Sequence, residues 1–140
     1  MAKPTQFAFV CVQNAGRSQM STAFAEQERR QRGLEESVDI VTGGTDPADH
    51  VHEEVVTVMH EIDIDVSGRT PQEVSEETLE ACDVVATMGC STLELDAESV
   101  EVRDWALDDP DGQDLDAVRA IRDDIEGRVS DLFDEFVDEA

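Results

Sequence analysis

The stretch Phe7-Ala8-Phe9-Val10-Cys11-Val12-Gln13-Asn14-Ala15-Gly16-Arg17-Ser18 decides how this chain begins to fold. Its first residues form a short apolar run, which predicts a buried strand over 7–11. That strand would deliver a thiol to a short loop opening into a helix over about 17–32, which Gly33 ends. A sulfur, backbone N–H groups, a helix N-terminus and the Arg17 guanidinium would then surround one small space. Such a space suits a tetrahedral oxyanion.

The rest of the chain alternates strand-like and helical patterns, without repeats or linkers. Further strands are expected over 38–42, 83–88 and 99–103, and helices over about 51–62 and after Ser75. The last helix is indicated by apolar residues at three- and four-residue spacing, which are Val118, Ile121, Ile125, Val129, Leu132, Phe133 and Phe136. Alternation of this kind predicts an α/β fold with a parallel sheet, in a single domain covering 1–140.

The composition narrows the classes of partner. Ten Lys and Arg stand against 35 Asp and Glu among 140 residues, so the net charge is −25. This charge argues against nucleic acid and anionic membranes as partners. Acidic residues interleave with apolar ones, and Lys3 is the only lysine, which predicts a folded halophilic protein with an acidic shell. The chain lacks a membrane-length apolar run and a signal-peptide core, so we expect it in the cytoplasm.

The loop after the first strand carries the chemistry. A thiolate is the reactive form of cysteine, and positive potential from a helix N-terminus, aligned amides and Arg17 would favour it at Cys11. The planar guanidinium can grip two oxyanion oxygens at once. The residues expected to bind the oxyanion are Val12, Gln13, Asn14, Ala15, Gly16, Arg17 and Ser18. Within this set Gly16 allows close approach, Asn14 tolerates a left-handed conformation, and Ser18 can donate to the sulfur.

The stretch 11–20 resembles the anion loop of low-molecular-weight protein tyrosine phosphatases, and specifically of their arsenate reductase relatives. The resemblance continues in order through 42–47, 58–65 and 87–90, and then through 104–110 and the final helix. It implies a three-layer αβα fold with a four-stranded parallel sheet. It also implies that Asp109, which precedes Pro110, is the general acid. Chemistry independently needs such a group, because the leaving oxygen requires a proton.

Two activities are compatible with this resemblance. Reduction of arsenate requires a second thiol, for which Cys90 is the candidate because it follows the third strand; Cys82 is expected at the opposite edge of the sheet. Relatives with a complete internal relay carry a further cysteine, which is absent from 91–96. The absence argues against an intramolecular relay that hands electrons to thioredoxin, and the alternative is a low-molecular-weight thiol that attacks the Cys11 adduct directly. The expected external reductant is thus a thioredoxin or glutaredoxin system, or a low-molecular-weight thiol. No bound cofactor is expected.

The alternative is a tyrosine or small-molecule phosphatase that hydrolyses a phosphocysteine. Against a phosphotyrosine substrate, the chain has no tyrosine and only Trp105 as an indole. An arsenate or phosphate oxyanion fits better than a phosphopeptide. A non-catalytic binding module would be expected to lose Cys11, Arg17 or Asp109, and all three are present. The three histidines are expected to face solvent from a helix rather than to bind a metal.

Overall fold

The computed structural model describes residues 5–44, 46–88, 100–105, 107 and 113–136. Four parallel strands form one sheet in the order β2-β1-β3-β4. The strands are β1 (Thr5–Cys11), β2 (Val38–Gly44), β3 (Val84–Met88) and β4 (Glu101–Asp104). The helices are α1 (Arg17–Gln31), α2 (Glu53–His60), α3 (Glu76–Glu80) and α4 (Leu115–Phe136). The predicted α/β class with a four-stranded parallel sheet is confirmed.

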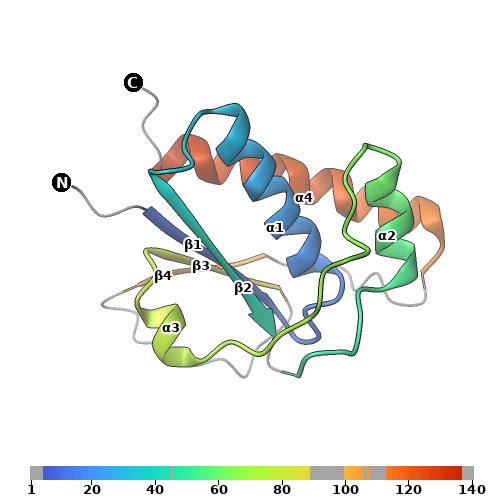
Figure 1. The fold of residues 1–140 in the computed structure, drawn as a ribbon, viewed down its shortest axis with the longest axis horizontal. Coiled ribbons are helices and arrows are strands. Elements are labelled where there is room, and N and C mark those ends of the chain that lie inside the picture. The colour runs from blue at the N-terminus through green and yellow to red at the C-terminus, as the bar shows by residue number, and fades with distance from the viewer. Residues whose placement is uncertain (1–4, 45, 89–99, 106, 108–112, 137–140) are drawn as a thin grey trace.

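The side chains of β1 alternate between two layers of helices. Phe7, Phe9 and Cys11 lie in the larger core, which also contains buried residues of α1, α2 and α4. Ala8 and Val10 face the opposite way, into a smaller core with α3. Figure 1 shows the same arrangement, with α1, α2 and α4 on one side of the sheet and α3 on the other. A strand buried on both faces explains why its sequence is a continuous apolar run.

The two longest helices follow the sequence pattern closely. Six of the seven apolar residues predicted for the last helix are buried in α4, and Phe136 packs partly buried against the same core. Helix α1 ends at Gln31, and Gly33 adopts a left-handed φ of 70° just beyond it. Glycine carries no penalty in that conformation, so it ends the helix as predicted.

The second helix and the fourth strand differ from their predicted bounds. Helix α2 is shorter than 51–62 because His52 is extended at its N-cap, with ψ 139°, and Asp63 turns the chain with φ 65°. Ile62 and Ile64 still pack against the core, and this made the helical pattern appear longer. Strand β4 begins at Glu101, two residues later than expected.

The carboxyl ends of the strands lie at one edge of the sheet. Cys11 stands in register with Gly44 of β2 on one side and with Met88 of β3 on the other. The chain leaves β1 for β2 in one direction, and β3 and β4 extend the sheet in the other. Ligands of open parallel sheets bind at such a switch point, outside the carboxyl ends. The loop after Cys11 therefore occupies the expected binding position.

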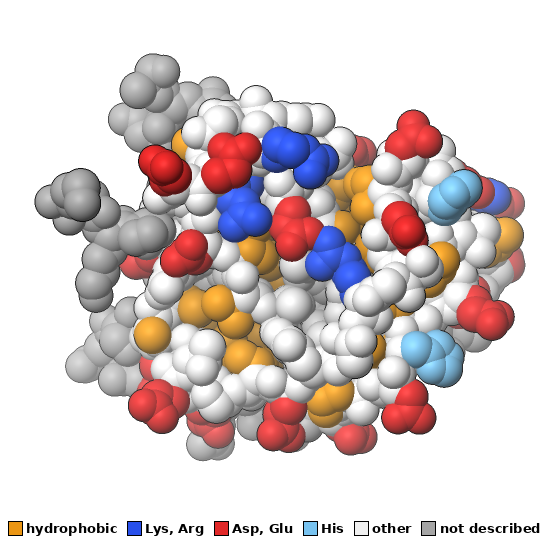
Figure 2. All heavy atoms as spheres, in the orientation of Figure 1, with side chains coloured by type: hydrophobic (Ala, Val, Ile, Leu, Met, Phe, Trp, Pro, Cys, Tyr) orange, Lys and Arg blue, Asp and Glu red, His pale blue; other side chains and the backbone are white. Residues whose placement is uncertain are grey.

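The surface is acidic, and most arginines are engaged by carboxylates. Figure 2 shows acidic side chains spread over one face, with arginines among them. Within the described part of the chain, six arginines form ion pairs with Asp or Glu, which are Arg32, Arg69, Arg103, Arg119, Arg122 and Arg128. Among the described segments, no helix is both long and apolar enough to cross a bilayer.

Candidate functional site

The loop between β1 and α1 turns its carbonyl groups outward. The carbonyl oxygens of Val12, Gln13 and Ala15 accept hydrogen bonds of 2.7, 2.9 and 2.9 Å from backbone N–H groups of the segment 46–52. The described part of the chain contains no cis peptide bond. In a trans peptide the next N–H points away from the carbonyl, so the N–H groups at 13, 14 and 16 turn inward. Converging N–H groups form a concave binding site for an anion.

The thiol of Cys11 lies at the base of this ring. The residue is 2% exposed. The Asn14 N–H donates to its sulfur over 3.2 Å, and the Ser18 hydroxyl oxygen lies 2.9 Å from the sulfur. Donors directed at the sulfur favour its anionic form. The predicted contact between Ser18 and Cys11 is therefore present.

Asn14 is the centre of the loop's internal hydrogen bonds. It is fully buried and has a φ of 52°, the left-handed conformation expected from the sequence. Its side-chain nitrogen donates to Ser18 Oγ over 2.7 Å and to Thr42 Oγ1 over 2.9 Å. Its side-chain oxygen accepts from Gln19 Nε2 over 3.1 Å and from the Gln72 N–H over 3.0 Å. All four polar directions of this carboxamide are thus used.

The N-terminus of α1 supplies positive potential to the same space. Its N-cap is Gly16, which has no side-chain cap, and no acidic residue lies in the first turn. The unpaired N–H groups of a helix start attract an anion. Arg17 begins the helix and is half-buried, and its Nη1 donates to the Leu107 carbonyl over 3.1 Å. The loop therefore meets the segment beyond β4 through this guanidinium.

Four contributors to the site were not singled out from the sequence, which are Gln19, Thr42, Gly44 and Gln72. Thr42 and Gly44 end β2 beside the loop, and a β-carbon at Gly44 would lie 2.5 Å from the Val12 carbonyl oxygen. Only glycine permits that approach. The run from Thr42 to Gly44 could have been found from the sequence, because it ends a predicted strand and so lies at the same edge of the sheet as the loop. Gln72 gave no signal, because it contributes a main-chain group.

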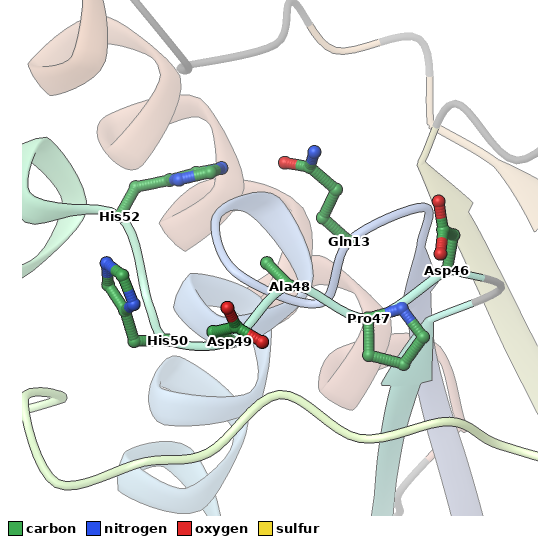
Figure 3. A pocket seen from close by; sticks show the side chains of 7 residues that line it. All are labelled: Gln13, Asp46, Pro47, Ala48, Asp49, His50 and His52. Carbon is green, nitrogen blue, oxygen red and sulfur yellow. The ribbon is translucent and has the colours of Figure 1, made fainter.

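A cavity of about 450 Å³ adjoins the loop. Figure 3 shows the segment 46–52 passing beside Gln13, whose side chain forms part of the lining. The lining residues are Gln13, Asp46, Pro47, Ala48, Asp49, His50 and His52. Apart from the two imidazoles, the described residues of this lining carry no aromatic ring. The single indole, Trp105, is instead packed in the core with its ring centroid 6.0 Å from that of Phe9.

Of the other candidate residues, Cys82 lies in the described part of the chain and away from the loop. Cys82 is buried in the smaller core on the α3 side, and burial raises the pKa of its thiol to about 11. The neighbouring Asp83 N–H donates to the Gln6 carbonyl, which places Cys82 near the start of β1 and away from Cys11, as predicted. Cys90 and Asp109 lie outside the described residues.

The histidines do not all occupy the predicted helix. His50 and His52 precede α2 and line the cavity, whereas His60 is exposed at the helix end. The expectation of helical positions was wrong for the first two, because α2 begins at Glu53. Within the described ranges, no group of three or more His, Cys, Asp or Glu side chains is placed to hold a metal ion.

Known proteins resemble this chain over most of its length. A protein of Halobacterium salinarum with the provisional name arsenate reductase is 76% identical over 132 residues, covering 94% of this chain and 93% of the relative. The glutaredoxin arsenate reductase of Synechocystis is 34% identical over 128 residues, covering 89% and 92%.

Solved structures agree with these sequence relatives. An arsenate reductase in the phosphate-binding state has a TM-score of 0.78 and 29% identity, covering 94% of this chain and 98% of its own. The Corynebacterium glutamicum thioredoxin-dependent arsenate reductase has a TM-score of 0.78 and 29% identity. The match covers 96% of this chain and 63% of the Corynebacterium chain. The model of one family, described as low molecular weight phosphotyrosine protein phosphatase, matches residues 6–140. This chain belongs to that family.

Proposed function

We propose that this protein reduces arsenate to arsenite with electrons from thiols. The observation that carries the proposal is the position of the Cys11 sulfur beneath a ring of inward N–H groups, with the Asn14 N–H and the Ser18 hydroxyl at the sulfur. Such a site binds a tetrahedral oxyanion and supports a thiolate beside it. Arsenate as the substrate is supported by the names of the relatives from Halobacterium and Synechocystis.

The proposed reaction has two thiol steps. The Cys11 thiolate attacks arsenic, a sulfur–arsenic bond forms, and one arsenic–oxygen bond breaks, with the oxygen leaving as water after protonation. A second thiol then attacks the Cys11 sulfur and forms a disulfide. The electron pair of the broken sulfur–arsenic bond passes to arsenic, which leaves as arsenite. Arg17 and the loop N–H groups hold the oxyanion through both steps.

Asp109 is proposed as the proton donor for the leaving oxygen. Its support comes from Leu107, which precedes it by two residues and accepts a hydrogen bond from Arg17. This contact between Arg17 and the segment just before Asp109, together with the resemblance of Asp109-Pro110 to the family's acid motif, supports the assignment.

Cys90 is proposed as the second thiol, with an external thiol completing the cycle. It follows Met88 by two residues, and Met88 stands in register with Cys11 on the neighbouring strand. Neighbouring strands lie about 4.8 Å apart, which favours Cys90 over the distant Cys82. The named relatives use glutaredoxin or thioredoxin, so a dithiol protein or a small thiol is the proposed reductant.

Phosphate ester hydrolysis is the second candidate, because the chain belongs to a phosphatase family. Among the described residues that line the cavity beside the loop, none is a Phe, Tyr or Trp that could stack on a phosphotyrosine ring. A solved relative binds phosphate, which supports inorganic phosphate as a competing ligand here. We therefore expect phosphatase activity to be a side activity on small esters.

The test measures arsenate reduction and p-nitrophenyl phosphate hydrolysis in parallel, with thioredoxin, glutaredoxin and small thiols supplied separately. Cys11→Ser should abolish both activities, whereas Cys90→Ser should abolish arsenate reduction and leave p-nitrophenyl phosphate hydrolysis intact. Arsenate turnover by Cys90→Ser with a small thiol would instead show that the external thiol attacks the Cys11 adduct directly. Cys82→Ser is the matched control and should retain both. The proposal fails if no reductant supports arsenate turnover, or if Cys11→Ser stays active.

A further inference from the structure

We propose that Gln72, through its main-chain N–H, and Gln19, through its side-chain amide, fix the direction of the hydrogen bonds that end on the Cys11 sulfur. They would be positioning residues that prepare the nucleophile before any oxyanion arrives. This role rests on the proposed function of Cys11 and deepens it. Neither residue was predicted from the sequence to belong to the site.

The orientation of the Asn14 carboxamide is the first step. The Gln72 main-chain N–H can only donate, so the Asn14 atom 3.0 Å from it must be the oxygen. Gln19 agrees with this orientation. Its Nε2 lies 3.0 Å from the Asn14 main-chain carbonyl, which can only accept, and 3.1 Å from the Asn14 side-chain oxygen. Two donors therefore hold the same oxygen, and the NH₂ group faces the other way.

The direction of the remaining protons follows. Thr42 Oγ1 donates to the Phe9 carbonyl over 3.0 Å, so it accepts from Asn14. Ser18 Oγ also accepts from Asn14, over 2.7 Å. The single hydroxyl proton of Ser18 is then left for the Cys11 sulfur, 2.9 Å away. The sulfur thus receives an O–H as well as the Asn14 N–H.

The opposite carboxamide orientation would reverse this arrangement. An Asn14 oxygen facing Ser18 would take the hydroxyl proton, and the sulfur would have to donate its own proton to Ser18. That state favours the neutral thiol. Because the thiolate is the nucleophile, the two donors from Gln72 and Gln19 would select the reactive form of Cys11.

The segment that carries Gln72 is anchored to the sheet. The Gly44 N–H donates to the Gln72 carbonyl over 2.8 Å, and Gln72 Nε2 donates to the Thr42 carbonyl over 2.8 Å. Glu73 forms a parallel bridge with Gly44. The main chain at Gln72 is thus held at the edge of β2, while the residue itself is exposed. Its side chain and its N–H have separate partners, so they can be tested separately.

The experiment follows ionisation of Cys11 through the ultraviolet absorbance of its thiolate across a pH titration. Each protein is compared with its own Cys11→Ser counterpart, which cancels signal from the other cysteines. The chain has no tyrosine whose ionisation would interfere. The test variants are Gln19→Met and a backbone ester at Gln72, in which an α-hydroxy acid replaces glutamine and removes only the N–H. Gln72→Ala is the matched control, because it keeps that N–H.

Both test variants should move the titration midpoint up by roughly one pH unit, since each removes a donor that supports a hydrogen bond to a charged group. Gln72→Ala should leave the midpoint in place. A double variant that combines Ser18→Ala with either test variant should have the same midpoint as Ser18→Ala alone, because all three changes act through the Ser18 hydroxyl. Additive shifts, or folded test variants with an unchanged midpoint, would overturn the proposal.

This readout needs no arsenate. If the midpoints shift as expected but no reductant supports arsenate turnover, the positioning role holds and the proposed function fails. If arsenate turnover is present and the midpoints do not move, the proposed function holds and the positioning role fails. A purely structural role would lower the melting temperature without moving the titration.

Discussion

At the scale of single residues, close packing around the oxyanion loop depends on Gly44. The loop passes so near the end of β2 that a β-carbon there would also lie 3.0 Å from the Asn14 main-chain nitrogen. That nitrogen carries one of the donors to the Cys11 sulfur. A side chain at Gly44 would therefore displace both the outer carbonyls and the inner N–H groups.

Gly44→Ala should weaken phosphate binding and lower the free energy of unfolding by about 1–3 kcal/mol, the usual cost of forcing an atom into a packed site. Calorimetric titration with phosphate and thermal melting measure the two effects. Gly68→Ala is the matched control, because a β-carbon at Gly68 meets nothing within 4 Å. Equal affinity and stability in Gly44→Ala and the wild type would contradict the packing argument.

At the scale of elements, α4 covers the larger core and carries one weak point. Gly127 lies within this 22-residue helix, and a β-carbon there would meet nothing within 4 Å. Glycine inside a helix loses more backbone entropy on folding than alanine does. The helix is thus less stable than it would be with alanine at position 127.

Gly127→Ala should raise the free energy of unfolding by roughly 0.5–1 kcal/mol. Gly33→Ala is the contrasting variant, since Gly33 has a φ of 70° and alanine is strained there. It should lower stability although it also adds one methyl group in open space. Chemical denaturation in high salt measures both, and a destabilising Gly127→Ala would refute the reasoning.

Glu61 ties α2 to α4. Its carboxylate accepts hydrogen bonds from Arg119 at 2.7 Å and Arg122 at 3.0 Å. The hydrogen bond from Arg119, followed by that from Arg122, lowers the pKa of Glu61 from its ordinary value of 4.5, against the opposing effect of desolvation. A lowered folded-state pKa means that this tie stabilises the fold above about pH 4.5 and is lost as the pH falls through the folded value.

Glu61→Gln should therefore lower the melting temperature near neutral pH, by a few degrees at most because the pair is exposed. The difference from wild type should shrink in acid. Asp131→Asn, on the exposed side of α4, is the matched control for removal of one negative charge. A difference that persists unchanged at low pH would exclude the ion pair as its cause.

At the scale of the whole molecule, 35 acidic residues face 10 basic ones. Even with every basic residue paired to a carboxylate, a net charge of −25 is left to repel itself. Salt shortens the range of that repulsion to about 3 Å at 1 M. A relative from Halobacterium salinarum is consistent with a high-salt setting.

The melting temperature should rise steeply as potassium chloride is raised from dilute buffer to molar concentration, and the fold should be lost reversibly at the dilute end. Circular dichroism at a series of salt concentrations measures this. A melting temperature independent of salt would show that the acidic shell does not limit stability.

The sequence predicted those parts of the fold and site that depend on local patterns. Phe7 and Phe9 alternate with smaller apolar residues, as a buried strand requires. Asn14 has the left-handed φ that was expected in the loop after Cys11. Gln72 could not be foreseen, because 58 residues separate it from Asn14 and its contribution is a main-chain N–H. Such contacts have no periodicity. The roles of Asp109 and Cys90, and the single domain over 1–140, stay predictions.

The position of Trp105 has a practical consequence. It is the only indole in a chain without tyrosine, and its carbonyl accepts a 2.9 Å hydrogen bond from the Leu107 N–H. Leu107 in turn holds Arg17. The fluorophore is thus two hydrogen bonds from the guanidinium that would grip the oxyanion. Its emission offers a label-free optical signal for titrating arsenate or phosphate into the unmodified protein.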